Sequence, residues 1–147
     1  MASTYLSLHY HIVFATKNRV ASLDEKWRSR LYDYLGGIIH TLGGFSKRIG
    51  GIDDHVHLLV SLKATHNLAD LMRELKKASS LWIHNTIGEK QFAWQQGYAA
   101  FTVSASALER VAKYIANQEQ HHRVKSFKEE LVVLLEKSAV DYNPEYL

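Results

Sequence analysis

The chain has 147 residues, of which 46% are apolar and 22% charged, as is typical of a single compact domain over residues 1–147. It contains no cysteine, which excludes disulfides and thiolate metal sites, and no run of the ~20 apolar residues that a membrane-spanning helix needs. The first residues lack the basic leader and apolar run of a signal peptide, so we expect a cytoplasmic protein. A formal net charge of +3 is compatible with a polyanionic partner but is too small to indicate one.

The first part of the chain predicts a strand followed by a helix. Residues 5–16 combine aromatic and β-branched residues without glycine or proline, which favours a strand. The S-x-x-E spacing of Ser22 and Glu25 is that of a capping box and predicts a helix over about 23–42. The glycine pair at 36–37 within this helix lowers its intrinsic stability, so we expect another backbone to pack closely there.

Two further strands and a second helix are predicted in the middle of the chain. Residues 45–49 and 52–62 are rich in strand-forming residues and flank the glycines at 50–51, which predicts a hairpin or tight turn. Asn67 can cap the following helix, which should reach about residue 86.

The last part predicts a fourth strand and two helices. The strand covers 97–104, and S-x-x-E spacings at 106–109 and 126–129 open helices that end near His122 and Lys137. The element order is therefore βαββαβ followed by two helices. We predict an α+β, ferredoxin-like sandwich with an antiparallel sheet, helices over one face of it, and additional C-terminal helices.

Two histidines are spaced by one residue in the predicted strand 52–62. Because side chains alternate along a strand, His55 and His57 share one face, opposite the apolar face formed by Val56 and Leu58. Residues i and i+2 are only ~7 Å apart, so both imidazoles can bind one metal ion. The alternative to a metal site is that both histidines are structural and form hydrogen bonds with neighbouring residues. The pattern His9-Tyr10-His11 in the first strand is a competitor that spacing alone does not exclude.

The helix after residue 107 carries a tyrosine away from its apolar stripe. Leu108, Val111, Ala112 and Ile115 form that stripe, whereas Arg110, Tyr114, Gln118 and His121 fall on the other side. Tyr114 and Gln118 are stacked by their i, i+4 spacing. Two imidazoles and an amide oxygen would leave open metal positions for a phosphate, which the phenol could attack in a transesterification. The alternatives are an exposed tyrosine or one that packs on a partner subunit.

Basic residues recur along the second predicted helix. Arg73, Lys76 and Lys77, with Ser80 and His84, lie at helical spacing opposite the apolar stripe and could contact DNA phosphates. A solvated helix surface is the alternative. Further candidates for DNA contact lie at strand ends and in the loops: Lys17, Arg19 and Arg48 for phosphates, and Phe92 or Trp94, either of which could equally belong to the core, for stacking on a base.

The sequence resembles the single-tyrosine transposases of the smallest insertion sequences, the IS200-like family, over nearly its whole length. The resemblance rests on five blocks in order: HIVFATKNR, GGIDDHVHLLVSL, LADLMRELKKASS, FAWQQGYAAFTVS and YIANQEQHH. It implies cleavage of single-stranded DNA at element ends that carry hairpins, through a 5′ phosphotyrosine, with Mg²⁺ or Mn²⁺. It also implies a homodimer in which the tyrosine helix of one subunit completes the active site of the other.

Carried over by position, His55 and His57 match the metal pair of this family, Tyr114 the nucleophile and Gln118 the third ligand. His9 and His11 are then read as structural neighbours of the site, and Asp53 or Asp54 as a residue that orients a ligand histidine. Two other functions stay open. One is a metal hydrolase that activates water on Zn²⁺; the other is a nonenzymatic hairpin-binding module or domesticated relative.

Overall fold

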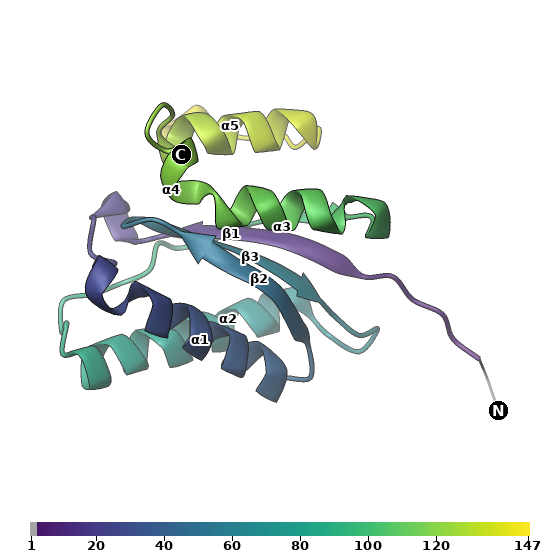
Figure 1. Ribbon diagram of the computed structural model, residues 1–147, viewed down its shortest axis with the longest axis horizontal. Helices are drawn as coiled ribbons and strands as arrows, with labels where there is room; N and C mark the ends of the chain where they lie inside the picture. Colours follow the sequence, from purple (N-terminus) through teal and green to yellow (C-terminus); the bar gives the residue numbers. More distant parts are fainter. Residues whose placement is uncertain (1–2) are drawn as a thin grey trace.

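A four-stranded antiparallel sheet forms the centre of the molecule, in a computed structural model that describes residues 3–147. The strands lie in the order β2-β3-β1-β4, with helices on both faces of the sheet (Figure 1). Their bounds are β1 His9–Ala15, β2 Phe45–Gly51, β3 His55–Ser61 and β4 Ala99–Val103. The helices are α1 Glu25–Thr41, α2 Leu68–Trp82, α3 Leu108–Ala116, α4 Gln118–His121 and α5 Phe127–Lys137. The predicted βαββαβ order and the α+β class are confirmed. Within residues 3–147 no helix is long and apolar enough to cross a membrane.

The first face of the sheet packs on α1 and α2, which lie below it in Figure 1. The alternation predicted for β3 is observed, because Val56, Leu58 and Val60 all face this layer and are fully buried. They contact the apolar stripes of the two helices. This face is therefore a continuous hydrophobic core, which leaves the other face of β3 free for polar side chains.

Helices α3 and α5 cover the second face of the sheet, above it in Figure 1, so helices cover both faces and not one alone as predicted. Ala112 and Ile115 of α3 pack on Leu59 of β3, as the predicted apolar stripe requires. Phe127 and Leu131 of α5 belong to a separate cluster with Val13 and Ala15 of β1. The site described below lies between these two small clusters.

Two of the three predicted capping boxes do not form. Helix α1 is capped by Asp24, whose side chain accepts a hydrogen bond from the Lys26 N–H, because the chain turns two residues later than the Ser22 spacing implied. No side chain caps α3. Residues 105–107 form a 3₁₀ turn, so Ser106 lies within that turn and Ala107 is the N-cap residue of α3. The predicted caps at Asn67 and Ser126 are confirmed, the latter as a reciprocal capping box.

The glycines play different roles from those predicted. Gly50 and Gly51 belong to β2 itself, and the turn to β3 follows them at 52–54. At Gly36 a Cβ would lie 3.2 Å from the Ser46 hydroxyl, so α1 approaches a side chain of β2 rather than a backbone. Around Gly37 nothing lies within 4 Å of the Cβ position, so no close approach requires that glycine.

Candidate active site

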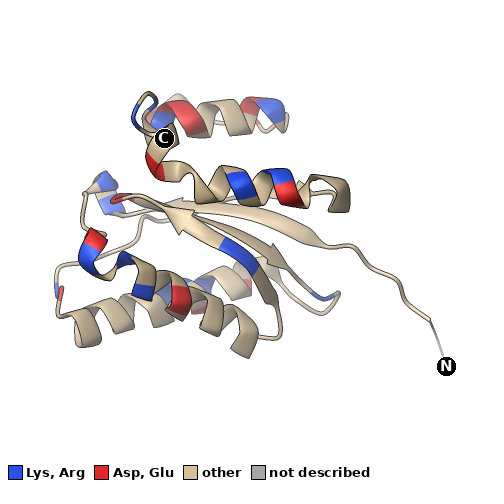
Figure 2. Cartoon of the chain, in the orientation of Figure 1, with Lys and Arg blue, Asp and Glu red and all other residues tan. Residues whose placement is uncertain are grey.

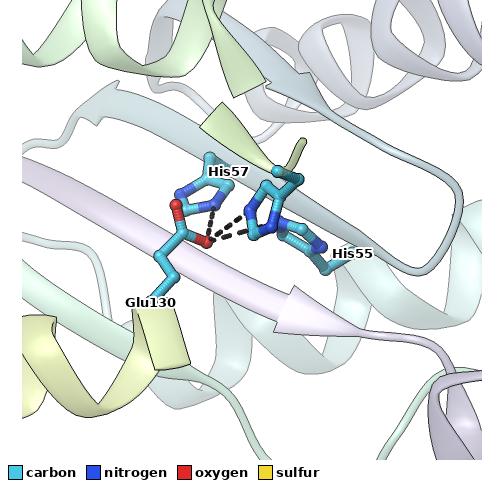
Figure 3. Close-up of side chains that lie close together, drawn as sticks. His55, His57 and Glu130 are labelled. Atoms are coloured by element: carbon cyan, nitrogen blue, oxygen red, sulfur yellow. Dashed lines mark hydrogen bonds and ion pairs between the residues drawn. The ribbon is translucent and has the colours of Figure 1, made fainter. Parts of the chain in front are cut away.

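His55 and His57 project from β3 toward the helices of the second face and are completely buried. Figure 3 shows their two imidazoles with the carboxylate of Glu130 directed at them. The centroids of the two rings are 5.1 Å apart. The predicted placement of the pair on one face is therefore observed, and neither side chain is exposed to solvent.

Helix α3 places Tyr114 beside the histidine pair because it lies directly on β2. Gly50 is paired with His57 across the two strands, and a Cβ at Gly50 would lie only 2.5 Å from the Ile115 carbonyl oxygen. The absent side chain lets the α3 backbone rest on the strand at this level. The Tyr114 ring consequently lies 5.8 Å from the His57 ring of the same chain.

The predicted helix to residue 122 is interrupted at Asn117, whose φ of −100° and ψ of 22° depart from helical values. Gln118 begins the short helix α4 and is 1% exposed. Its Oε1 lies 3.1 Å from His55 Nε2. On the side opposite the apolar stripe, Gln118 is thus buried against Glu130 of α5, whereas Arg110 is exposed.

Glu130 of α5 is the central residue of the site, and sequence reasoning missed it. Its Oε1 lies 3.0 Å from His57 Nε2 and 3.1 Å from His122 Nε2. Its Oε2 accepts hydrogen bonds from the Tyr114 hydroxyl and, at 3.0 Å, from the Gln118 amide. The residues predicted to share a site thus meet at one carboxylate, joined by His122.

A signal for Glu130 is present in the sequence. Phe127, Leu131 and Leu135 form the buried stripe of α5, and Glu130 falls within that stripe at i+3 from Phe127. A carboxylate on the buried side of a helix requires a partner, which makes it a candidate site residue. The sequence does not show which partner, because the sheet face that α5 covers depends on the tertiary fold.

Residues outside the cluster fix the orientation of the two imidazoles. Asp54 Oδ1 accepts a hydrogen bond from His55 Nδ1 at 2.7 Å, which holds the ring with its Nε2 directed toward the site. His11 Nε2 lies 2.7 Å from His57 Nδ1. Because the neutral His57 donates from Nε2 to the Glu130 carboxylate, its Nδ1 accepts this hydrogen bond from the His11 Nε2–H. His9 instead contacts the Ser61 hydroxyl, outside the site.

Burial and hydrogen bonding shift the pKa values of the cluster in opposite directions. Burial lowers the pKa of His57 to about 4 and that of His11 to about 3. Burial also acts to lower the pKa of His55, but the carboxylates of Asp54 and Glu130 outweigh it and raise this pKa to about 9. Without a metal, His55 is therefore protonated beside the Glu130 carboxylate, and a divalent cation can replace that proton.

The carboxyl and the phenol are shifted as strongly. Burial alone would raise the pKa of Glu130, but hydrogen bonds from His122, His55 and His57 hold it well below its usual range. Burial and the hydrogen bond to Glu130 raise the pKa of Tyr114, so the phenol is neutral.

The cluster has the donors and spacing that a divalent cation requires. One possible ligand atom from each of His55, His57, His122 and Glu130 lies within 4.8 Å of the others. Two ligand atoms that share an ion at about 2.1 Å lie at most about 4.2 Å apart, so small side-chain movements suffice. Imidazoles with a carboxylate suit first-row divalent ions such as Mn²⁺. The residues present therefore fit a metal.

A pocket of about 350 Å³ opens onto this cluster from the surface. Tyr114 and Glu130 are part of its lining. Arg110, Lys125 and Lys137 are among the residues that line it, on α3, the α4–α5 connection and α5. Figure 2 shows Lys and Arg on both helices of this layer. The pocket thus lies between these basic residues and the tyrosine, and no sequence pattern indicated it.

The basic residues predicted on α2 do not form a continuous free surface. Arg73 forms an ion pair with Asp70, and Lys76 donates to the backbone oxygen of Gln95 at 3.0 Å. Lys77 is exposed. Burial lowers the pKa of Lys76, in keeping with a structural contact. The structure does not bring α2 together with the histidine cluster, because α2 covers the other face of the sheet.

The remaining predicted contacts are dispersed. Lys17 and Arg48 are exposed, whereas Arg19 lies over the Phe127 ring at 5.6 Å. Phe92 and Trp94 are core residues at 6% and 9% exposure, which accounts for both without a stacked base.

Known proteins resemble this chain in sequence and in fold. Residues 4–118 match the family described as "Transposase IS200 like". The ISDra2 transposase TnpA of Deinococcus radiodurans is 29% identical over 117 residues, which cover 76% of this chain and 84% of that protein.

Two solved structures share the fold. A crystal structure of a transposase from Deinococcus radiodurans has a TM-score of 0.65 and 28% identity, over 80% of this chain and 96% of that one. A REP-associated tyrosine transposase bound to a REP hairpin has a TM-score of 0.60 and 15% identity, over 83% and 74%. With the family match over most of its length, the chain belongs to the IS200-like transposase family.

Proposed function

We propose that the protein cleaves and rejoins single-stranded DNA at the ends of an insertion sequence through a covalent bond to Tyr114. The observation that supports this most directly is that the Tyr114 hydroxyl and the imidazoles of His55 and His57 converge on one buried carboxylate. A phenol that shares a metal-binding cluster is suited to attack a phosphodiester, and the chain belongs to a transposase family.

The side chains of the site have distinct roles in this reaction. The Tyr114 oxygen forms a bond to phosphorus while the bond to the 3′ oxygen breaks, which leaves a 5′ phosphotyrosine and a free 3′ hydroxyl. The phenolic proton is released, and the departing 3′ oxygen takes one up. Attack by another 3′ hydroxyl reverses the step and rejoins DNA. Mg²⁺ or Mn²⁺ held by His55, His57 and Gln118 would polarise the phosphate.

The pocket that opens onto Tyr114 would receive the scissile strand. Its basic residues Arg110, Lys125 and Lys137 would contact phosphates of that strand. The solved relative bound to a REP hairpin supports recognition of a folded hairpin by this chain as well. Lys17, Arg48, Arg73 and Lys77 remain predicted contacts for the hairpin. Arg19 and Lys76 also remain predicted, although both already contact the protein itself.

A covalent-adduct assay tests this function. Purified protein with Mn²⁺ and single-stranded DNA from its own element end should give a protein–DNA band that resists denaturant, and duplex DNA of the same sequence should give little. Tyr114→Phe should reduce cleavage by about three orders of magnitude or more, because the nucleophile is lost. Tyr142→Phe removes a phenol that bonds Glu136 outside the site and should leave cleavage unchanged.

The same assay separates the alternative functions. A metal hydrolase would still cut DNA after Tyr114→Phe, since water would be its nucleophile. A binding module would retain the hairpin without forming an adduct in the wild-type protein. Either outcome would contradict the proposal.

A further inference from the structure

The geometry points to a double role for Glu130: we propose that its Oε1 is a ligand of the divalent cation and that its Oε2 positions Tyr114. This inference rests on the proposed function and deepens it. Glu130 lies on α5, outside residues 4–118 that match the family. Helix α5 would thus be part of the active site.

The Oε1 atom already lies among the imidazole nitrogens. It is 3.0 Å from His57 Nε2, 3.1 Å from His122 Nε2 and 3.4 Å from His55 Nε2. An ion placed between Oε1 and these three nitrogens could be bound by all four atoms after small side-chain movements. A carboxylate adds negative charge and a hard oxygen to an otherwise neutral set of imidazoles and an amide, which strengthens binding of Mn²⁺ or Mg²⁺.

The Oε2 atom faces the nucleophile. It accepts hydrogen bonds from the Tyr114 hydroxyl and from the Gln118 amide, and His121 Nε2 lies 3.5 Å away. Because the two oxygens have separate partners, Glu130 can bind an ion through one atom without releasing Tyr114 from the other. One side chain would then fix the distance between the cation and the phenolic oxygen.

Anchoring of α5 does not account for this arrangement. Phe127, Leu131 and Leu135 already pack the helix on the sheet, and the capping box of Ser126 and Glu129 secures its start. A buried carboxylate is costly to desolvate, and its partners here are the predicted nucleophile and metal ligands. This set of partners indicates a function in the chemistry.

Metal binding measured without DNA tests the Oε1 contact. Isothermal titration or the electron paramagnetic resonance signal of free Mn²⁺ should show one site in the wild-type protein. Glu130→Gln keeps the shape but removes the charge and should weaken Mn²⁺ binding at least about tenfold, in keeping with the loss of an anionic ligand. Glu136→Gln removes an exposed carboxylate from the same helix and should leave the affinity unchanged.

Equal or tighter Mn²⁺ binding by Glu130→Gln would overturn the proposal, because the carboxylate would then be neutral toward the ion or compete with it. If the variant does not fold, a crystal structure of the wild-type protein with Mn²⁺ decides. The anomalous peak should lie about 2.2 Å from Glu130 Oε1. A peak held by His55, His57 and Gln118 with Glu130 out of reach would overturn it.

Single-turnover cleavage at saturating Mn²⁺ tests the Oε2 contact. Glu130→Gln can still accept the Tyr114 hydrogen bond and should retain more of the rate than Glu130→Ala, with DNA affinity alike in both. Equal rates would overturn the positioning role. Failure of the wild-type protein to form any adduct would remove the proposed function, whereas the Mn²⁺ measurements would still stand.

Discussion

His57 shows how neighbouring side chains determine what a buried histidine can do. It is completely buried, with His11 on its Nδ1 side and Glu130 on its Nε2 side. Burial keeps it neutral by lowering its pKa to about 4, and a neutral imidazole is the form that binds metal. The H-x-H spacing was sufficient to find His57, but His11 was separated from the metal pair only through the family resemblance.

The buried histidines should make the metal-free protein sensitive to acid. In the unfolded chain His11 and His57 have a pKa of about 6.5, whereas the folded values are about 3 and about 4. The unfolded state therefore binds more protons below pH 6.5, and stability falls as the pH decreases. The free energy of unfolding in urea with EDTA should be lower at pH 4.5 than at pH 6.5 by on the order of 4 kcal/mol, about half of it from each histidine.

His55 sets the other limit of this pH dependence. Its folded pKa of about 9 exceeds the unfolded value, so its contribution is present below pH 6.5 and is lost as the pH rises toward 9. Stability should therefore be greatest near pH 6.5. His11→Gln removes one of the titrating groups and should therefore reduce the decrease in the free energy of unfolding between pH 6.5 and pH 4.5. If the free energy of unfolding of this variant decreased as much as that of the wild-type protein, His11 would not contribute to the acid sensitivity.

At the scale of elements, the contact between α3 and β2 determines where the tyrosine lies. A side chain at Gly50 would clash with the backbone oxygen of Ile115, which a rotamer change cannot relieve. Gly50→Ala should therefore move α3 and Tyr114 away from His57. We expect a loss of stability of about 1–3 kcal/mol, as for other overpacked sites, together with a lower cleavage rate.

Gly37→Ala is the matched control for Gly50→Ala. No atom lies within 4 Å of a Cβ at Gly37, and the position is inside α1, where alanine is favoured over glycine by roughly 0.5–1 kcal/mol. This variant should be at least as stable as the wild-type protein in thermal unfolding. If both variants behaved alike, the contact at Gly50 would not position the helix.

Most elements were predictable from the sequence because their signals are local. Alternation along β3 and the apolar stripe at Leu108, Val111, Ala112 and Ile115 both reflect burial against a neighbouring layer, and both are observed. The break at Asn117 was not predictable, because the residues around it continue the helical pattern. The unformed cap at Ser106 shows likewise that a four-residue spacing permits a cap without requiring one.

In the molecule as a whole, the two faces of the sheet carry different kinds of side chain. The face toward α1 and α2 holds the large apolar core, whereas the face toward α3 and α5 holds the histidine cluster between two small apolar clusters. Periodicity paired His55 with His57 on the strand and Tyr114 with Gln118 on the helix, whereas the family resemblance implied that the two pairs share a site; the structure brings them together. Glu130 of α5 and His122 after α4 complete the cluster; the buried stripe of α5 marks Glu130 as needing a partner, but no local pattern shows that this partner is the histidine pair.

The single chain already contains the tyrosine and the histidine pair in contact distance. Tyr114 lies beside His57 of its own chain, so each subunit can form its site from its own residues. A mixture of Tyr114→Phe and His57→Ala proteins should then remain inactive in the adduct assay. Recovered activity would instead support the homodimer with shared sites, which remains a prediction from the family resemblance.

The covalent link between DNA and Tyr114 is the central claim, and peptide mass spectrometry tests it most directly. The wild-type protein is incubated with Mn²⁺ and a single-stranded oligonucleotide from its element end, then digested with nuclease and protease. We predict a nucleotide phosphate attached to the peptide that contains Tyr114. Cleaved DNA with an unmodified Tyr114 peptide, or with the nucleotide on another residue, would contradict the account.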